Sequence, residues 1–119
     1  MFTGYELTSS AKNALIQAFP PKYERVICHH IIEKYGVSKK EPAPEMPENV
    51  EVIGYIDSGD GVEGFLVSIN GSTKRPDGKD YHITHSISQD RKPVETNNYI
   101  ANAVKINPIA IRVEPKNFW

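Results

Sequence analysis

The sequence predicts an α+β fold: a compact single domain over residues 1–119, mainly antiparallel sheet with one clear N-terminal helix. Three observations lead to this prediction. A chain of 119 residues suits one domain with one modest core. One segment near the N-terminus has apolar residues at helical spacing. The other apolar segments are short, rich in β-branched residues and separated by turn signals, which is typical of strands.

The first strand is expected over residues 2–7, and the helix follows it directly. Thr8 or Ser9 can cap the start of this helix. Its apolar residues are spaced i, i+3, i+4, i+7 and i+8 and are Ala11, Ala14, Leu15, Ala18 and Phe19. Two prolines, Pro20 and Pro21, then end the helix because proline cannot continue the hydrogen-bond ladder.

The middle of the chain predicts four strands. Residues 24–37 are apolar and β-branched and indicate one buried strand. Three prolines in residues 38–49 indicate a surface loop. Further strands are expected at 50–57, 62–69 and 81–88, with a tight hairpin "SGDG" between the first two and a polar, basic loop before the last.

The last part of the chain predicts one short helix and one strand. Residues 89–104 are expected to combine a turn with a helix that starts near Thr96 or Asn97. Residues 107–115 are expected to form a final strand. These segments bring the expected total to five or six strands with one clear helix.

Composition limits the possible partners. The formal net charge is −1 and the 14 Lys and Arg residues form no basic block, so a duplex-binding face is not expected. The one cysteine, Cys28, cannot form an internal disulfide, which favours a reducing compartment and therefore a cytoplasmic protein. The N-terminal residues lack the pattern of a signal peptide. Since no apolar run approaches about 20 residues, no membrane partner is expected.

All four histidines lie in two apolar segments, "CHHIIEKYG" at 28–36 and "DYHITHSIS" at 80–88. Side chains alternate between the two faces of a strand. In the second segment His82, Thr84, Ser86 and Ser88 therefore share one face, which is expected to line a cleft or face water. The other face, with His85 among apolar residues, belongs in a core. In the first segment Val26, Cys28, His30 and Ile32 are expected to share a face, opposite His29.

Two other interpretations of the histidines remain open at this stage. Histidines beside apolar residues are often packed, hydrogen-bonded groups with no catalytic role. A zinc site is the other interpretation, because Cys28, His30 and His82 could supply three ligands. The sequence has no CxxC or HExxH spacing, so we expect no metal.

Several segments together resemble the two-histidine (2H) phosphoesterase superfamily, whose hallmark is a repeated His-apolar-Thr motif. His82-Ile83-Thr84 matches this motif, and His30-Ile31-Ile32 matches its histidine. The strand "TGYEL", the doublet "HH" followed by Gly36, "VIGYIDSGDGVEGFLV", "YHIT" and "RKPVETNNYI" resemble the small branch found alone or attached to RNA ligases and RNA-repair proteins. The resemblance covers roughly residues 2–101.

This resemblance implies a 2H-phosphoesterase-like fold and a metal-independent phosphodiesterase without a cofactor. His30 and His82 would be its acid–base pair, and Thr84 would hold a non-bridging phosphate oxygen. The implied ligands are 2′,3′-cyclic phosphates at RNA ends, or cyclic nucleotides that include immune signals. Imidazole chemistry agrees, since an ordinary pKa near 6.5 lets one histidine be neutral and the other protonated in the cell.

Ile32 departs from the family motif, because it cannot donate a hydrogen bond to phosphate. Loss of one such donor commonly lowers the rate by ~10²–10³. Either the enzyme is slower, or another group replaces the donor, or the protein binds and sequesters a nucleotide without turnover. The candidate replacements and further phosphate or nucleotide contacts are Tyr5, Lys34, Ser86, Asn97 and the basic loop with Lys74, Arg75 and Lys79. Phe118 and Trp119 at the chain end could fold back over the sheet or cap a homo-oligomer interface.

Overall fold

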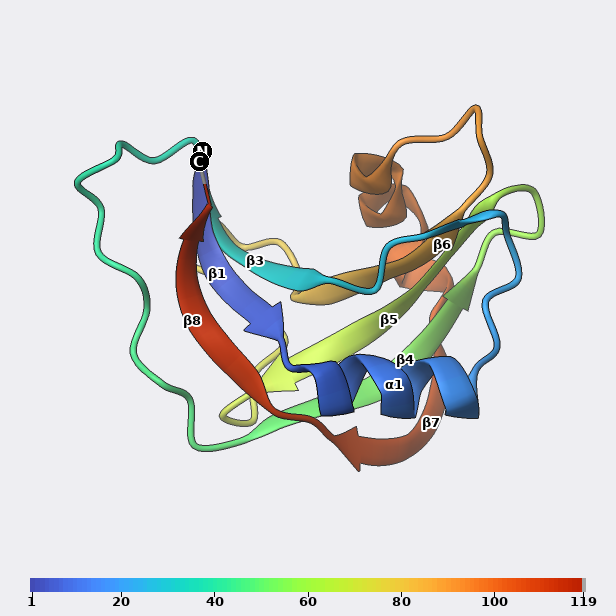
Figure 1. The fold of residues 1–119 in the computed structure, drawn as a ribbon, viewed down its shortest axis with the longest axis horizontal. Coiled ribbons are helices and arrows are strands. Elements are labelled where there is room, and N and C mark those ends of the chain that lie inside the picture. Colours follow the sequence, from blue (N-terminus) through green and yellow to red (C-terminus); the bar gives the residue numbers. More distant parts are fainter. Residues whose placement is uncertain (119) are drawn as a thin grey trace.

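The computed structural model describes residues 1–118, which form two antiparallel sheets and two helices (Figure 1). The small sheet has the order β3 (His30–Tyr35), β1 (Phe2–Leu7), β8 (Val113–Phe118). The large sheet has the order β2 (Arg25–Val26), β6 (His82–Ile87), β5 (Val62–Ile69), β4 (Val50–Asp57), β7 (Val104–Ala110). The helices are α1 (Ser9–Ala18) and the 3₁₀-helix η1 (Pro93–Asn102). The α+β class is confirmed.

Local sequence signals predicted β1, α1, β4, β5 and β6 well. β1, β4 and β5 have the expected bounds, and β6 differs from its expected range by one residue at each end. Thr8 caps α1, because its Oγ1 accepts a hydrogen bond from the Ala11 N–H at 3.2 Å. Neither helix within residues 1–118 is long and apolar enough to cross a membrane.

The prediction of one strand over 24–37 is wrong, because the chain changes sheets there. Arg25 and Val26 pair with β6, and the Cys28 N–H still donates to the Thr84 carbonyl at 2.9 Å. Cys28 then adopts a left-handed backbone with φ +41°, which breaks the strand. His30 begins β3, which pairs with β1 in the other sheet. Cys28 and His30 therefore do not share a strand face: Cys28 is fully buried in the core.

The prediction of one strand over 107–115 is wrong for the same kind of reason. β7 pairs with β4 in the large sheet, and β8 pairs with β1 in the small sheet. The break falls at Ile111 and Arg112, where the Ile111 N–H donates to the Val50 carbonyl at 3.0 Å. The C-terminal segment thus connects the two sheets, and the chain has more strands than expected.

The helix expected near Thr96 starts earlier, at Pro93. Proline is favoured at a first helical position because its missing N–H would have no partner there. The Glu95 side chain also accepts a hydrogen bond from the Lys92 N–H at 2.6 Å, which stabilises this earlier start.

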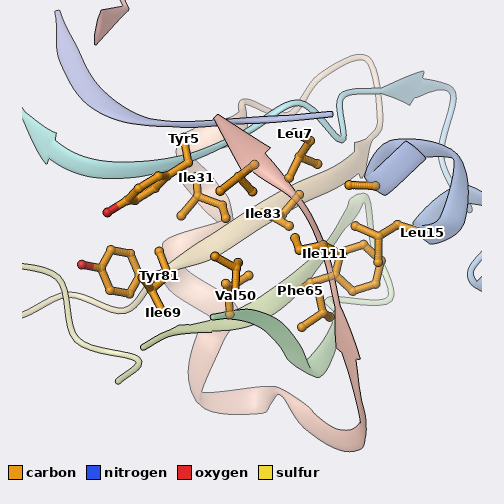
Figure 2. Packing of buried hydrophobic residues seen from close by; sticks show 14 of the residues in the cluster. Tyr5, Leu7, Leu15, Ile31, Val50, Phe65, Ile69, Tyr81, Ile83 and Ile111 are labelled. Carbon is orange, nitrogen blue, oxygen red and sulfur yellow. The ribbon is translucent and has the colours of Figure 1, made fainter. Parts of the chain in front are cut away.

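The core lies between the two sheets and α1, as Figure 2 shows. Tyr5, Leu7 and Ile31 from the small sheet face Phe65 and Ile83 from the large sheet. All six residues of β6 are buried, but the core cluster contains Tyr81 and Ile83 from the predicted core face, whereas His82 and Thr84 from the other face line a pocket. His85 belongs to the predicted core face because its Nε2 donates to the Phe19 carbonyl at 2.7 Å and its ring packs on Phe65 at 4.7 Å.

Gly64 on β5 allows η1 to lie close against the large sheet. A Cβ at this position would lie 2.7 Å from the Ile83 carbonyl oxygen and 2.9 Å from Cγ2 of Thr96 in η1. Such distances are shorter than any normal carbon contact, so a larger residue would displace the helix. This close approach holds η1 beside β6, where it forms one wall of the candidate site.

Candidate active site

A cavity of about 370 Å³ opens beside the neighbouring strands β3 and β6. β3, the 70–80 loop, β6 and η1 each contribute to its wall. The lining residues are His30, Ile32, Tyr35, Arg75, Asp77, Lys79, His82, Thr84, Pro93, Val94 and Asn97. The two predicted catalytic histidines belong to different sheets and meet here because the chain crosses between the sheets at Cys28.

A bulge in β3 decides which of its residues reach this pocket. The pairing with β1 shifts so that Gly4 lies opposite Ile32 and Thr3 lies opposite Lys34, which leaves Glu33 as the extra residue. The alternation of faces therefore slips by one residue, and Tyr35 joins His30 and Ile32 in the pocket. Lys34 lies outside the pocket, and its Nζ pairs with Glu41 at 3.3 Å.

The His82 ring is fixed by the backbone just before β6. Its Nδ1 lies 3.0 Å from the Asp80 carbonyl oxygen. A carbonyl oxygen only accepts, so Nδ1 carries a hydrogen and Nε2 has the free lone pair when the ring is neutral. The residue is 8% exposed, and this burial lowers the pKa of His82, with the nearby charges of Arg75 and Lys79 acting in the same direction.

His30 is the second histidine of the pocket, and its pKa is lowered more than that of His82. Burial lowers the pKa of His30 to about 4, and the neighbouring His29 and His82 rings contribute in the same direction. Glu6 partly opposes this shift. Both imidazoles are thus neutral at pH 7 in the ligand-free pocket, which differs from the expectation that one of them is protonated. A bound anion would raise both pKa values again.

The Thr84 hydroxyl lies in the pocket but already has protein partners. Its Oγ1 donates to the Pro93 carbonyl at 3.1 Å and lies 2.8 Å from the Thr96 Oγ1. A hydroxyl has a single hydrogen to donate. Thr84 must therefore release the Pro93 carbonyl before it can donate to a phosphate oxygen.

Arg75 and Lys79 make the pocket cationic. The Arg75 side chain is only 4% exposed and is held by Asp77 through its Nε at 3.1 Å and through Nη2. Lys79 makes no ion pair within the described part of the chain, residues 1–118. With neutral histidines, two cations and one carboxylate leave a net charge of +1 in the lining. This charge favours an anionic ligand.

Asn97, which matches the family motif, also lines the pocket. Its Nδ2 donates to the Val94 carbonyl at 3.0 Å. Its buried Oδ1 has no hydrogen-bond partner among residues 1–118.

Three other predicted binding residues lie elsewhere. Tyr5 is 4% exposed and belongs to the core. Ser86 is fully buried, and its hydroxyl donates to the Glu63 carboxylate at 2.5 Å. Lys74 points to Asp80, with Nζ and Oδ1 2.8 Å apart. Burial or an existing partner keeps each of these side chains out of the histidine pocket.

Tyr35, Asp77, Pro93 and Val94 are pocket residues that the sequence analysis missed. The sequence pattern did not indicate Tyr35, because simple alternation from His30 places Lys34 on the pocket face instead. Asp77 lies within a Pro-Asp-Gly sequence, which predicts a turn. That pattern does not indicate the ion pair that Asp77 forms with Arg75.

The zinc interpretation does not fit these residues. Cys28 lies in the core, where burial raises the pKa of its thiol to about 11, and it does not line the pocket. Within residues 1–118 no three His, Cys, Asp or Glu side chains are placed to hold a metal ion. The three ligands expected from the sequence are therefore not brought together.

No family model, curated protein or solved structure matches this chain. Function is therefore inferred from the pocket residues and their chemistry.

Proposed function

We propose that the protein is a phosphodiesterase of the two-histidine type that hydrolyses a cyclic phosphate or another nucleotide phosphodiester in the cytoplasm. The observation that carries this proposal is the meeting of His30 and His82, from two different sheets, in one cationic pocket. Its volume of about 370 Å³ lies in the range of small-molecule sites. That size suits one nucleotide or one RNA end rather than a duplex.

His30 is assigned as the base of the pair, because its pKa is lowered to about 4 and its ring is therefore unprotonated over the whole physiological range. In the proposed step His30 takes a proton from water, and the water oxygen forms a bond to phosphorus. The bond from phosphorus to the leaving oxygen breaks, and His82 donates its proton to that oxygen. The charge of the bound phosphodiester raises the pKa of His82, so that it carries this proton.

Arg75 and Lys79 supply the phosphate contacts that Ile32 cannot make. Of the groups considered as replacements for the missing hydroxyl, these two line the pocket. Cations aimed at the non-bridging oxygens stabilise the charge that develops during phosphoryl transfer. The Arg75 guanidinium can also bind two phosphate oxygens at the same time, after it releases the Asp77 carboxylate.

Tyr35 and Val94 support a nucleotide as the ligand. Both line the pocket, from β3 and η1 respectively, and both are strongly exposed, at 71% and 65%. An exposed aromatic ring beside a phosphate site is suited to stack on a nucleobase.

A Tyr35→Ala variant is expected to raise KM for a nucleotide substrate about tenfold, because base stacking contributes ~1–3 kcal/mol. We expect kcat to change little, since Tyr35 does not contact the reacting atoms. Tyr35→Phe keeps the ring and serves as the control. Equal KM values for Tyr35→Ala and Tyr35→Phe would contradict a stacking role.

The dependence of kcat/KM on pH is expected to be bell-shaped, with its maximum between about pH 4 and pH 6.5. kcat/KM reports the free enzyme, in which His30 must be neutral and His82 protonated. The rate therefore rises as pH increases through about 4 and falls as pH passes the lowered pKa of His82. A plateau that extends above pH 8 would contradict this assignment.

Incubation of the pure protein with a panel of substrates in EDTA tests the proposed function. The panel contains RNA with 2′,3′-cyclic phosphate ends and cyclic di- and trinucleotides, and products are separated by chromatography. We expect hydrolysis of at least one class, and loss of that hydrolysis in His82→Ala. Hydrolysis retained by His82→Ala, or no hydrolysis and no binding, would overturn the proposal.

A nucleotide-binding protein without turnover is the second candidate. The engaged Thr84 hydroxyl and the apolar Ile32 favour it, since both reduce the number of hydrogen-bond donors to phosphate. In the same experiment this function predicts a nucleotide that is retained by the protein and recovered intact after denaturation.

A further inference from the structure

A chain of three side chains leads from the surface to His30. The Glu6 Oε2 lies 3.1 Å from the His29 Nε2. The His29 Nδ1 lies 3.1 Å from the His30 Nδ1. Glu6 and His30 are also direct partners across the β1–β3 pair, so the backbone register fixes this arrangement. His29 therefore engages the Nδ1 of His30. The Nε2 of His30 is the ring nitrogen that takes no part in this contact.

The carboxylate of Glu6, at the end of this series of side chains, determines which ring nitrogens carry a hydrogen. A carboxylate only accepts hydrogen bonds, so the His29 Nε2 carries a hydrogen and donates it to Glu6. In neutral His29 the Nδ1 then has a lone pair and accepts. The hydrogen between the two Nδ1 atoms therefore belongs to His30. A neutral His30 in this arrangement keeps its lone pair on Nε2.

We propose that Glu6 and His29 are positioning residues that hold His30 in the tautomer with a hydrogen on Nδ1 and a free lone pair on Nε2. Their catalytic effect rests on the proposed function, whereas the tautomer does not. When the His30 Nε2 accepts a proton from water, its Nδ1 hydrogen can pass to the His29 Nδ1. The positive charge then lies on His29, beside the Glu6 carboxylate, and all protons are accounted for.

The surroundings of the chain fix the two rings and limit the charges that act on them. The Phe2 ring packs on His30 at 5.2 Å, and the Phe118 ring packs on His30 at 5.5 Å and on His29 at 6.2 Å. The other titratable neighbours are Lys116 on β8, whose Nζ lies 3.2 Å from the Glu6 Oε2, and His82 on β6, which contributes to the lowered pKa of His30. These contacts hold the imidazoles in place while the hydrogens move.

Nitrogen-15 NMR of the imidazoles of the full chain at pH 7 tests this tautomer directly and needs no substrate. In the wild type we expect His30 with a protonated Nδ1 and a bare Nε2. In His29→Ala we expect the hydrogen of His30 to move, at least in part, to Nε2. His82, which is held by the Asp80 carbonyl, is the internal control and should be unchanged. A protonated Nε2 on wild-type His30, or no change in His29→Ala, would overturn the proposal.

Kinetics separate this proposal from the proposed function. With a substrate from the panel, His29→Ala is expected to lower kcat about tenfold with KM unchanged, less than the ~10²–10⁴-fold loss expected for the base itself. Glu6→Gln keeps an acceptor but removes the charge, so it should keep the tautomer and fall between the wild type and His29→Ala. If NMR shows the expected tautomers but no substrate is hydrolysed, the proposed function fails and the positioning of His30 stands. An unchanged kcat in His29→Ala would overturn the catalytic part.

Discussion

Glutamine in place of either His30 or His82 is expected to lower kcat/KM for the hydrolysed substrate by ~10²–10⁴-fold. Each imidazole transfers one proton in the same transition state, and glutamine keeps a similar size without an acid–base function. Because the two residues act as a unit, the kcat/KM of the double variant is expected to be only slightly below that of the less active single variant. Steady-state kinetics of the three variants measure this directly.

A surface substitution on the same strand provides the matched control. Lys34 lies on β3 with His30 but outside the pocket, paired with Glu41, so Lys34→Ala is expected to keep the wild-type rate. Urea denaturation of each histidine variant shows whether the fold is retained. A folded His30→Gln or His82→Gln protein with kcat/KM within about threefold of the wild type would remove that histidine from the mechanism.

Glu63→Ala is expected to lower the free energy of unfolding by ~1–3 kcal/mol for each buried donor that it leaves without a partner. Glu63 is 1% exposed and is satisfied entirely by neutral donors. Its carboxylate accepts from the Lys22 N–H at 3.0 Å, the Ser86 hydroxyl at 2.5 Å and the Tyr55 hydroxyl at 2.5 Å. Alanine would leave these donors without a partner and would release the loop after α1 from β5 and β6.

Two further variants calibrate this stability measurement by urea denaturation. Glu63→Gln retains a carbonyl oxygen and most of the volume, so it is expected to destabilise the protein less than alanine does. Glu24 is exposed, and Glu24→Ala is expected to change the free energy of unfolding by less than about 0.5 kcal/mol. A Glu63→Ala effect as small as that of Glu24→Ala would show that the buried network contributes nothing to stability.

Elements whose signals are local could be predicted from the sequence. The helical stripe that begins at Ala11, the Thr8 cap and the two prolines after Phe19 delimit α1 without any tertiary contact. The hairpin signal "SGDG" delimits the β4–β5 pair in the same way, and the structure then shows alternating burial along β4. The faces of β6 also followed from alternation, which separated His82 and Thr84 from His85 correctly.

The long apolar segments could not be divided correctly from the sequence. A continuous β-branched run looks the same whether it stays in one sheet or leaves it for another. The change of sheet at Cys28 depends on a left-handed backbone angle at a residue that rarely adopts one. At Ile111 it depends on which strand edge remains unpaired after the rest of the chain has folded.

The sequence by itself determined the α+β class, the helix, the main strands and the two histidines that form the candidate pair. The tertiary structure alone decided that His30 and His82 meet, that Arg75 and Lys79 join them, and that Tyr35 replaces Lys34 at the pocket. Strand and helix signals act between residues close in sequence, whereas this site depends on a crossing between two sheets and on one extra residue in β3. Burial in that crossing also lowers the pKa values of both histidines, and no local pattern encodes burial.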